Sequence, residues 1–118
     1  MWTIGGKMII ESKLSNTGKY FNLVKLRYET YMKTAFPSLN IGKVEMVKGR
    51  KYTKIIIENG VHSFIDNTNG NILKPNSYRA PHKTPRGNIM TEENQLQSFG
   101  SNNPKSNSYY WIKYLHRG

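Results

Sequence analysis

The chain has 118 residues, with 18 Lys or Arg against 7 Asp or Glu, a formal net charge of +11 and no cysteine. The length predicts a single domain (1–118) with one hydrophobic core. The charge favours an acidic partner, with nucleic acid first and another anionic surface second. The lack of cysteine excludes disulfides, thiol catalysis and Cys-ligated zinc, and the lack of a run of about 18 apolar residues leads us to expect no membrane partner.

The first element expected is an N-terminal arm over residues 1–18. It carries large apolar residues that could form a strand or pack on the body of the domain: Trp2, Ile4, Met8, Ile9 and Ile10. The arm has neither the long apolar stretch nor the small-residue cleavage site of a signal peptide. The composition, which lacks cysteine, favours an intracellular protein.

Residues 19–36 predict a helix. Its mostly apolar and aromatic positions recur at three- and four-residue spacing, which lines one helical face: Tyr20, Leu23, Val24, Arg27, Tyr28, Tyr31, Met32 and Ala35. Asn16 or Thr17 is the expected N-cap. Pro37 is expected to end the helix at Phe36.

Residues 40–74 predict an antiparallel meander of three or four strands. Turn signals recur at short spacing at residues 48–50, 59–60 and 67–70. The strongest is Asn59-Gly60, because both residues tolerate the positive φ of a type I′ turn. Neither helix nor sheet can bury its apolar side alone, so the expected fold is α+β, with the N-terminal helix packed on the meander.

The rest of the chain looks less regular. Prolines at 75, 81 and 85 disfavour helix and strand, so we expect a basic, proline-containing loop over residues 75–91. Residues 92–118 are expected to form a linker and an aromatic C-terminal arm. The arm either returns to the core as a strand or binds another chain, because its apolar surface is costly to leave in water. Its candidate partner-binding residues, for a protein partner or for self-association, are Tyr109, Tyr110, Trp111 and Tyr114.

Basic residues gather in two stretches of the sequence, residues 48–54 and residues 74–86, and residues 67–91 contain no Asp or Glu. Arginine can direct two hydrogen bonds at one phosphate, and lysine adds point charge. Tyr78 offers a stacking plane for an unpaired base, and Tyr52 and Phe64 are further stacking candidates. We expect these groups on a common patch; the alternative is a solvated loop that binds nothing specific. The candidate nucleic-acid-binding residues are Lys48, Arg50, Lys51, Lys54, Lys74, Tyr78, Arg79, Lys83 and Arg86.

One part of the chain matches a recognisable pattern, namely GRKY at residues 49–52, an aromatic residue at 64, and K-x-x-x-[WY]-[KR]-A-P-x-K-x-x-R-G-N at residues 74–88. On this pattern the segment 49–89 resembles a family of small proteins encoded by tailed bacteriophages and related viral metagenomes. Tyr78 stands where that family tends to carry Trp. The resemblance implies a viral origin, and with it the host-cell cytoplasm or the virion as location; it implies no particular activity.

The sequence contains no residue pattern that strongly indicates a catalytic site. The three histidines, His62, His82 and His116, share no metal-binding spacing, so we expect no metal and no cofactor. The acids are few and scattered, which argues against a two-metal site, and no nucleotide-binding or hydrolase motif is present.

The first hypothesis is therefore a non-enzymatic, small basic phage-type protein that binds DNA, RNA or another polyanion, mostly through phosphate contacts. One alternative is a protein–protein interaction role through the aromatic arm, as a virion component or as an inhibitor of a host defence or polymerase complex. The second alternative is a small metal-dependent nuclease.

Overall fold

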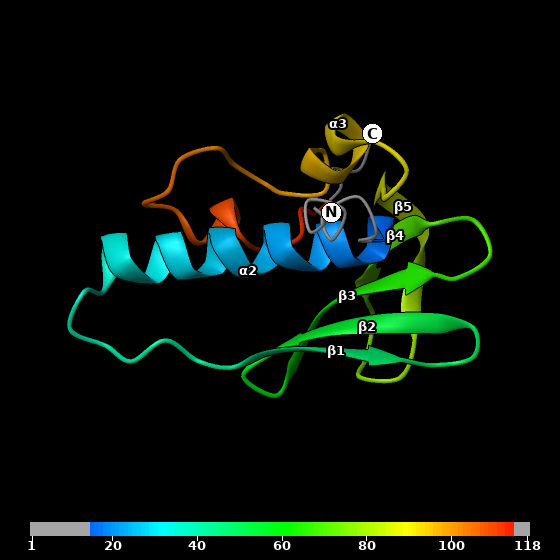
Figure 1. Ribbon diagram of the computed structural model, residues 1–118, viewed down its shortest axis with the longest axis horizontal. Helices are drawn as coiled ribbons and strands as arrows, with labels where there is room; N and C mark the ends of the chain where they lie inside the picture. Colours follow the sequence, from blue (N-terminus) through cyan, green and yellow to red (C-terminus); the bar gives the residue numbers. More distant parts are fainter. Residues whose placement is uncertain (1–14, 115–118) are drawn as a thin grey trace, which may run out of the picture.

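The computed structural model describes residues 15–114 (Figure 1), so most of the expected N-terminal arm lies outside the described residues. The elements are α2 (Asn16–Ala35), β1 (Val44–Lys48), β2 (Tyr52–Ile57), β3 (Gly60–Asp66), β4 (Asn71–Pro75), β5 (Pro81–Asn88), α3 (Glu92–Leu96) and the short 3-10 helix η1 (Asn107–Tyr109). The five strands form one antiparallel sheet in the order β1-β2-β3-β4-β5. The α+β prediction is confirmed, with one strand more than expected.

The helix α2 begins one residue earlier than the expected caps allow. Ser15 has an extended backbone, and its hydroxyl accepts a 2.9 Å hydrogen bond from the Gly18 N–H, so Ser15 is the N-cap in place of Asn16 or Thr17. At the other end, the Phe36 N–H still bonds to the Met32 carbonyl before Pro37 stops the helix.

The β2–β3 turn differs from the expected Asn59-Gly60 turn by one residue. Positive φ occurs at Glu58 (50°) and Asn59 (75°), and Gly60 is already paired with Ile57 as the first residue of β3. The Tyr28 hydroxyl donates a hydrogen bond to the Glu58 carboxylate, and this contact with α2 holds Glu58 in the turn.

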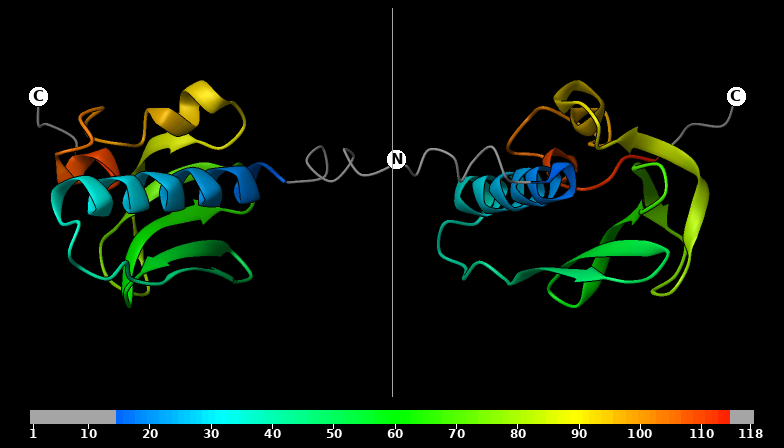
Figure 2. Two further views of the ribbon diagram at one scale, coloured as in Figure 1. Left: turned by 60° about the vertical axis from the view of Figure 1, so that its left-hand side comes forward. Right: turned by 45° about the vertical axis from the view of Figure 1, so that its right-hand side comes forward.

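The fifth strand lies where an irregular loop is expected. Pro81 and Pro85 fall within β5, which occupies one edge of the sheet, and Figure 2 shows this strand curving along that edge. Proline has no N–H to donate, and it is compatible with an edge strand because the side of that strand away from the sheet has no ladder partner. Two register shifts on β4 accompany these positions, beside Leu73. The loop prediction is therefore wrong for residues 81–88.

The sheet has a cluster of buried side chains on each face. One face packs under α2, where strand residues such as Ile55, Ile65 and Ile72 contact Tyr20, Val24 and Tyr28, together with Ile89, Phe99 and Ile112. Neighbours along a strand alternate between faces. The second cluster accordingly joins residues of the opposite face, Ile56, Val61, Phe64 and Leu73, with Tyr52 at its margin.

The C-terminal segment returns to its own domain. Figure 1 shows it on the side of α2 away from β1 and β2, and Ile112 forms an isolated antiparallel bridge with Phe99. Of the two expected alternatives for the aromatic arm, the structure shows the return to the core. The pairing is a single bridge, not a full strand.

Candidate polyanion-binding surface

Lys54 joins the two basic stretches of the sequence. Its ammonium nitrogen lies 4.2 Å from the ring centroid of Tyr78, in the β4–β5 turn, and 5.7 Å from that of Phe64, on β3. A cation at this distance is attracted to the face of an aromatic ring. The β1–β2 region and the turn after β4 therefore meet at one place on the sheet.

The strand register explains this meeting. Lys54 is paired with Phe64, and Phe64 with Leu73, so all three lie on the face opposite α2. Tyr52 lies on the same face and packs its ring edge-on against Phe64, with 5.6 Å between centroids. Lys51 adds a second cation, 5.4 Å from the Tyr52 centroid. Arg79 follows Tyr78 in the sequence and is exposed in the same turn. We call the set the basic-aromatic surface: Lys51, Tyr52, Lys54, Phe64, Tyr78 and Arg79.

The turn that carries Tyr78 and Arg79 is closed by its own hydrogen bonds. The N–H groups of Asn76 and Ser77 both donate to the Ala80 carbonyl at 2.9 Å. The Ser77 hydroxyl accepts from the N–H groups of Arg79 (3.3 Å) and Ala80 (3.1 Å). Tyr78 and Arg79 are both exposed at the tip of this turn, so their side chains are presented to solvent from a fixed backbone.

The surface carries little compensating negative charge. Among residues 15–114 the one ion pair joins Lys43 to Glu45 at 3.9 Å. Within this range, then, Lys51, Lys54 and Arg79 have no carboxylate at ion-pair distance. Uncompensated cations near one another produce a local positive potential that attracts anionic ligands.

Arg86 is not available to a phosphate, contrary to its predicted role. Only 8% of the residue is exposed. Its guanidinium donates to the carbonyls of Thr84 (2.8 Å) and Lys113 (3.3 Å), and burial lowers its pKa. The C-terminal segment, distant in sequence, supplies one of these carbonyls, so Arg86 holds that segment to β5.

Lys74 also lies away from the basic-aromatic surface. Leu73, the preceding residue, lies on the face opposite α2, so the Lys74 side chain points to the α2 face of the sheet. There its ammonium lies 4.2 Å from the ring centroid of Tyr114. The predicted patch is divided between two faces of the sheet.

The remaining predicted contacts, Arg50, Lys83 and Lys48, are exposed and lie outside the basic-aromatic surface. Arg50 shares the β1–β2 turn with Lys51, and Lys83 lies on β5. Lys48 pairs with Thr53 on the α2 side of the sheet. There it lines a hollow of about 640 Å³ between the start of α2 and the β3–β4 turn.

The candidate partner-binding aromatics mostly pack on their own domain. The Tyr110 ring lies 5.0 Å from that of Tyr28 and 5.2 Å from that of Tyr31. Trp111 packs edge-on against His62, at 5.3 Å. Tyr114 is the exception, with 69% of its surface exposed.

Arg27 is a structural residue that the sequence analysis did not identify as important, and Tyr109 packs against it. Its guanidinium lies between the rings of Phe99 (4.5 Å) and Tyr109 (4.3 Å). It donates to the carbonyls of Ser101 (3.1 Å) and Tyr109 (2.8 Å) and to the Asn102 side chain (3.1 Å). An arginine on the apolar face of a predicted helix is the signal that could have identified it.

Neither a metal-ligand cluster nor a membrane-spanning helix is found in the part of the chain that the structure describes. Residues 15–114 contain no group of three or more His, Asp or Glu side chains arranged to hold a metal ion. In the same range, no helix combines the length and apolar character needed to cross a bilayer.

Comparison with known proteins gives one match. The profile of Family of unknown function (DUF7717) matches residues 11–109, which is most of the chain. No curated protein and no solved structure matches.

Proposed function

The chain belongs to this family of unknown function, and we propose that it binds nucleic acid or another polyanion, without catalysis, mostly through phosphate contacts on the basic-aromatic surface. The observation that carries the proposal is the position of Lys54, 4.2 Å from the Tyr78 ring centroid, which connects basic residues of β2 with those of the β4–β5 turn. The proposed phosphate contacts are Lys51, Lys54 and Arg79, with Arg50 and Lys83 at the margins. Arg86 and Lys74 are left out because of their packing.

Electrostatic binding of this kind has a measurable signature. Each phosphate neutralised by a lysine or arginine releases condensed counterions, so the logarithm of the affinity falls with the logarithm of the salt concentration, by about 0.9 per contact on duplex DNA. From the resemblance to tailed-bacteriophage proteins we further propose where binding occurs: the protein binds the polyanion in the cytoplasm of an infected cell or in a virion.

The test is a salt titration of the triple variant Lys51→Ala/Lys54→Ala/Arg79→Ala against labelled duplex DNA. We expect weaker binding at every salt concentration and a salt slope that is shallower by about 0.9 for each contact removed. Duplexes of different sequence should lose affinity equally, because phosphate contacts carry no sequence information.

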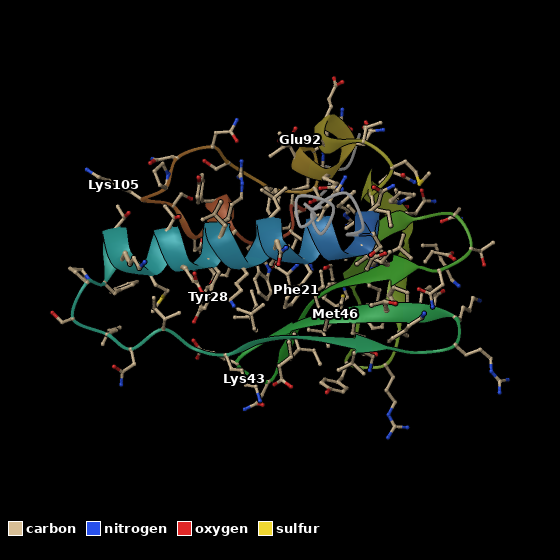
Figure 3. All side chains as sticks on the ribbon, in the orientation of Figure 1. Phe21, Tyr28, Lys43, Met46, Glu92 and Lys105 are labelled. Carbon is tan, nitrogen blue, oxygen red and sulfur yellow. The ribbon has the colours of Figure 1, made fainter. Side chains whose placement is uncertain are left out.

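A matched control removes three other exposed cations, in the variant Lys25→Ala/Lys33→Ala/Lys105→Ala. Lys25 and Lys33 lie on α2, and Lys105 projects from the side of the molecule away from β1 and β2 (Figure 3). Net charge changes by the same amount in both variants. An equal loss of affinity in the control would show that total charge, and not the basic-aromatic surface, determines binding.

A further inference from the structure

The polyanion-binding proposal does not distinguish paired from unpaired nucleic acid, but the environment of Tyr78 does. Resting on that proposal, we infer that the ligand is single-stranded nucleic acid and that one unpaired base stacks on the Tyr78 ring while Lys54 and Arg79 contact the neighbouring phosphates. Three observations on Tyr78 and its neighbours carry this inference.

The first is the accessibility of the ring. Tyr78 is 55% exposed although the Lys54 ammonium lies 4.2 Å from its centroid. A planar ring has two faces, and the cation occupies one of them. The opposite face is therefore open to a flat ligand.

The second is the hydrogen-bonded turn backbone that carries the ring. The turn backbone around Tyr78 is closed by the hydrogen bonds to Ala80 and to the Ser77 hydroxyl. A turn whose backbone is already ordered has less conformational freedom to lose when a base packs on its side chain. This preorganisation favours stacking over a loose contact with the same ring.

The third is the packing of the other two stacking candidates on this face, Phe64 and Tyr52. Phe64 is fully buried, and Tyr52 packs edge-on against it with an interplanar angle of 80°. Phe64 therefore cannot receive a base, and Tyr52 is half-buried against Phe64, whereas Tyr78 is exposed. Tyr78 is the ring suited to stacking, so we expect one base per site.

The combination of a stacking ring and adjacent cations matches the way proteins bind single strands without sequence preference. In a duplex each base is already stacked and paired, and reaching Tyr78 would require flipping it out of the helix. A single strand presents its bases without that cost. The surface should therefore prefer a single strand to a duplex of the same length.

The experiment compares three labelled probes at one salt concentration with the full chain: an oligothymidylate, an abasic strand of the same length, and a duplex. For the variant Tyr78→Leu we expect oligothymidylate affinity to fall by about 5-fold to about 150-fold, the range of one base–aromatic stack. Affinity for the abasic strand and the duplex should stay unchanged, because they offer phosphates but no free base. Tyr78→Phe keeps the ring and should retain the wild-type affinity.

Tyr114→Leu is the matched control. Tyr114 is also exposed and also has a lysine ammonium 4.2 Å from its ring, but that lysine, Lys74, points to the other face of the sheet. We expect no change in affinity for any probe. A loss equal to that of Tyr78→Leu would overturn the assignment to Tyr78.

Failure of stacking and failure of polyanion binding give different results. If the wild-type protein binds the abasic strand as tightly as oligothymidylate, or if Tyr78→Leu weakens all three probes equally, the stacking inference is wrong and polyanion binding stands. If the wild-type protein binds none of the three probes, both are wrong.

Discussion

A hydrogen bond of 2.6 Å joins the Nε2 atom of His62, on β3, to the backbone carbonyl of Tyr110. A carbonyl can only accept, so Nε2 carries the proton and donates it. Nδ1, 2.9 Å from the Ser63 hydroxyl, is then the acceptor of that hydrogen bond. The neutral imidazole is thus satisfied at both nitrogens, and it connects the sheet to the C-terminal segment.

This buried histidine should make stability depend on pH. Burial lowers the pKa of His62 from 6.5 to about 4. His62 is therefore protonated near pH 6.5 in the unfolded chain, but only near pH 4 in the folded chain. The free energy of unfolding from this group is fully present above pH 6.5 and falls as the pH drops towards 4, by up to about 3 kcal/mol.

Urea unfolding between pH 7 and pH 4 measures this effect. Carboxylates also titrate at the acidic end, so the wild type is compared with His62→Gln, whose curve should be flatter over this interval. His82→Gln is the control, because His82 is exposed on β5 and should follow the wild type. Parallel curves for all three proteins would contradict the prediction.

Arg27 should be a major determinant of C-terminal packing. Replacing it with Met keeps most of the side-chain volume but removes the hydrogen bonds to Ser101, Asn102 and Tyr109. We expect a loss of about 2–4 kcal/mol in the free energy of unfolding, because three part-buried acceptors lose a charged donor and the ring contacts of the guanidinium are lost. Arg27→Lys should recover little of it, since an ammonium lacks the planar fork that reaches several acceptors at once.

Chemical denaturation gives the energies for Arg27, and amide hydrogen exchange shows where the structure opens. Protection should fall first at Lys113, whose N–H bonds to the Ser98 carbonyl. Lys25→Met, an exposed substitution two residues earlier on α2, should leave both measurements unchanged.

Tyr28 and Glu58 should be energetically coupled. Burial, reinforced by the hydrogen bond to Glu58, raises the pKa of Tyr28 to about 12. The phenol should therefore remain protonated at a pH at which exposed tyrosines ionise. Tyr28→Phe removes the donor and should cost about 1–2 kcal/mol in the wild type.

A double-mutant cycle isolates this contact. In a Glu58→Gln background, which removes the charge but keeps the turn, the cost of Tyr28→Phe should be smaller by at least about 0.5 kcal/mol. Additive effects within error would mean that the two side chains do not stabilise each other.

The helix and its buried face follow directly from the sequence. Tyr20, Val24 and Tyr28 recur at a helical period, and a period depends only on spacing along one element. The strand β5 cannot be predicted from the sequence in the same way, because proline disfavours a strand at positions 81 and 85 when only the local sequence is considered. The edge position that makes these prolines acceptable is defined only once the sheet has formed.

The candidate site shows the same division. Lys54 and Tyr78 carry a basic-aromatic signal in the sequence, and the fold brings them into contact. Arg86 carries an equally strong signal, but its guanidinium donates a hydrogen bond to the carbonyl of Lys113. Contacts between segments so far apart along the chain have no local signature, so sequence reasoning cannot separate the exposed arginine from the buried one.

The last prediction tests the position of the β2–β3 turn with two glycine substitutions. In the expected Asn59-Gly60 turn, Gly60 would need a positive φ, and Gly60→Ala would be destabilising. In the structure the positive φ values belong to Glu58 and Asn59, and a Cβ at Gly60 would lie 3.6 Å from its nearest neighbour, the Ile57 carbonyl oxygen. Gly60→Ala should therefore change the free energy of unfolding by less than about 0.5 kcal/mol.

Gly70→Ala is the counterpart and should cost more than about 1 kcal/mol. Gly70 has a φ of 80°, and a Cβ there would lie 2.9 Å from the Ile89 side chain. Thermal or urea unfolding of the two variants under the same conditions gives the comparison. If Gly60→Ala proved the more destabilising, the turn would have the register that Asn59-Gly60 suggests. Glu58 would then be displaced from the turn position in which Tyr28 holds it.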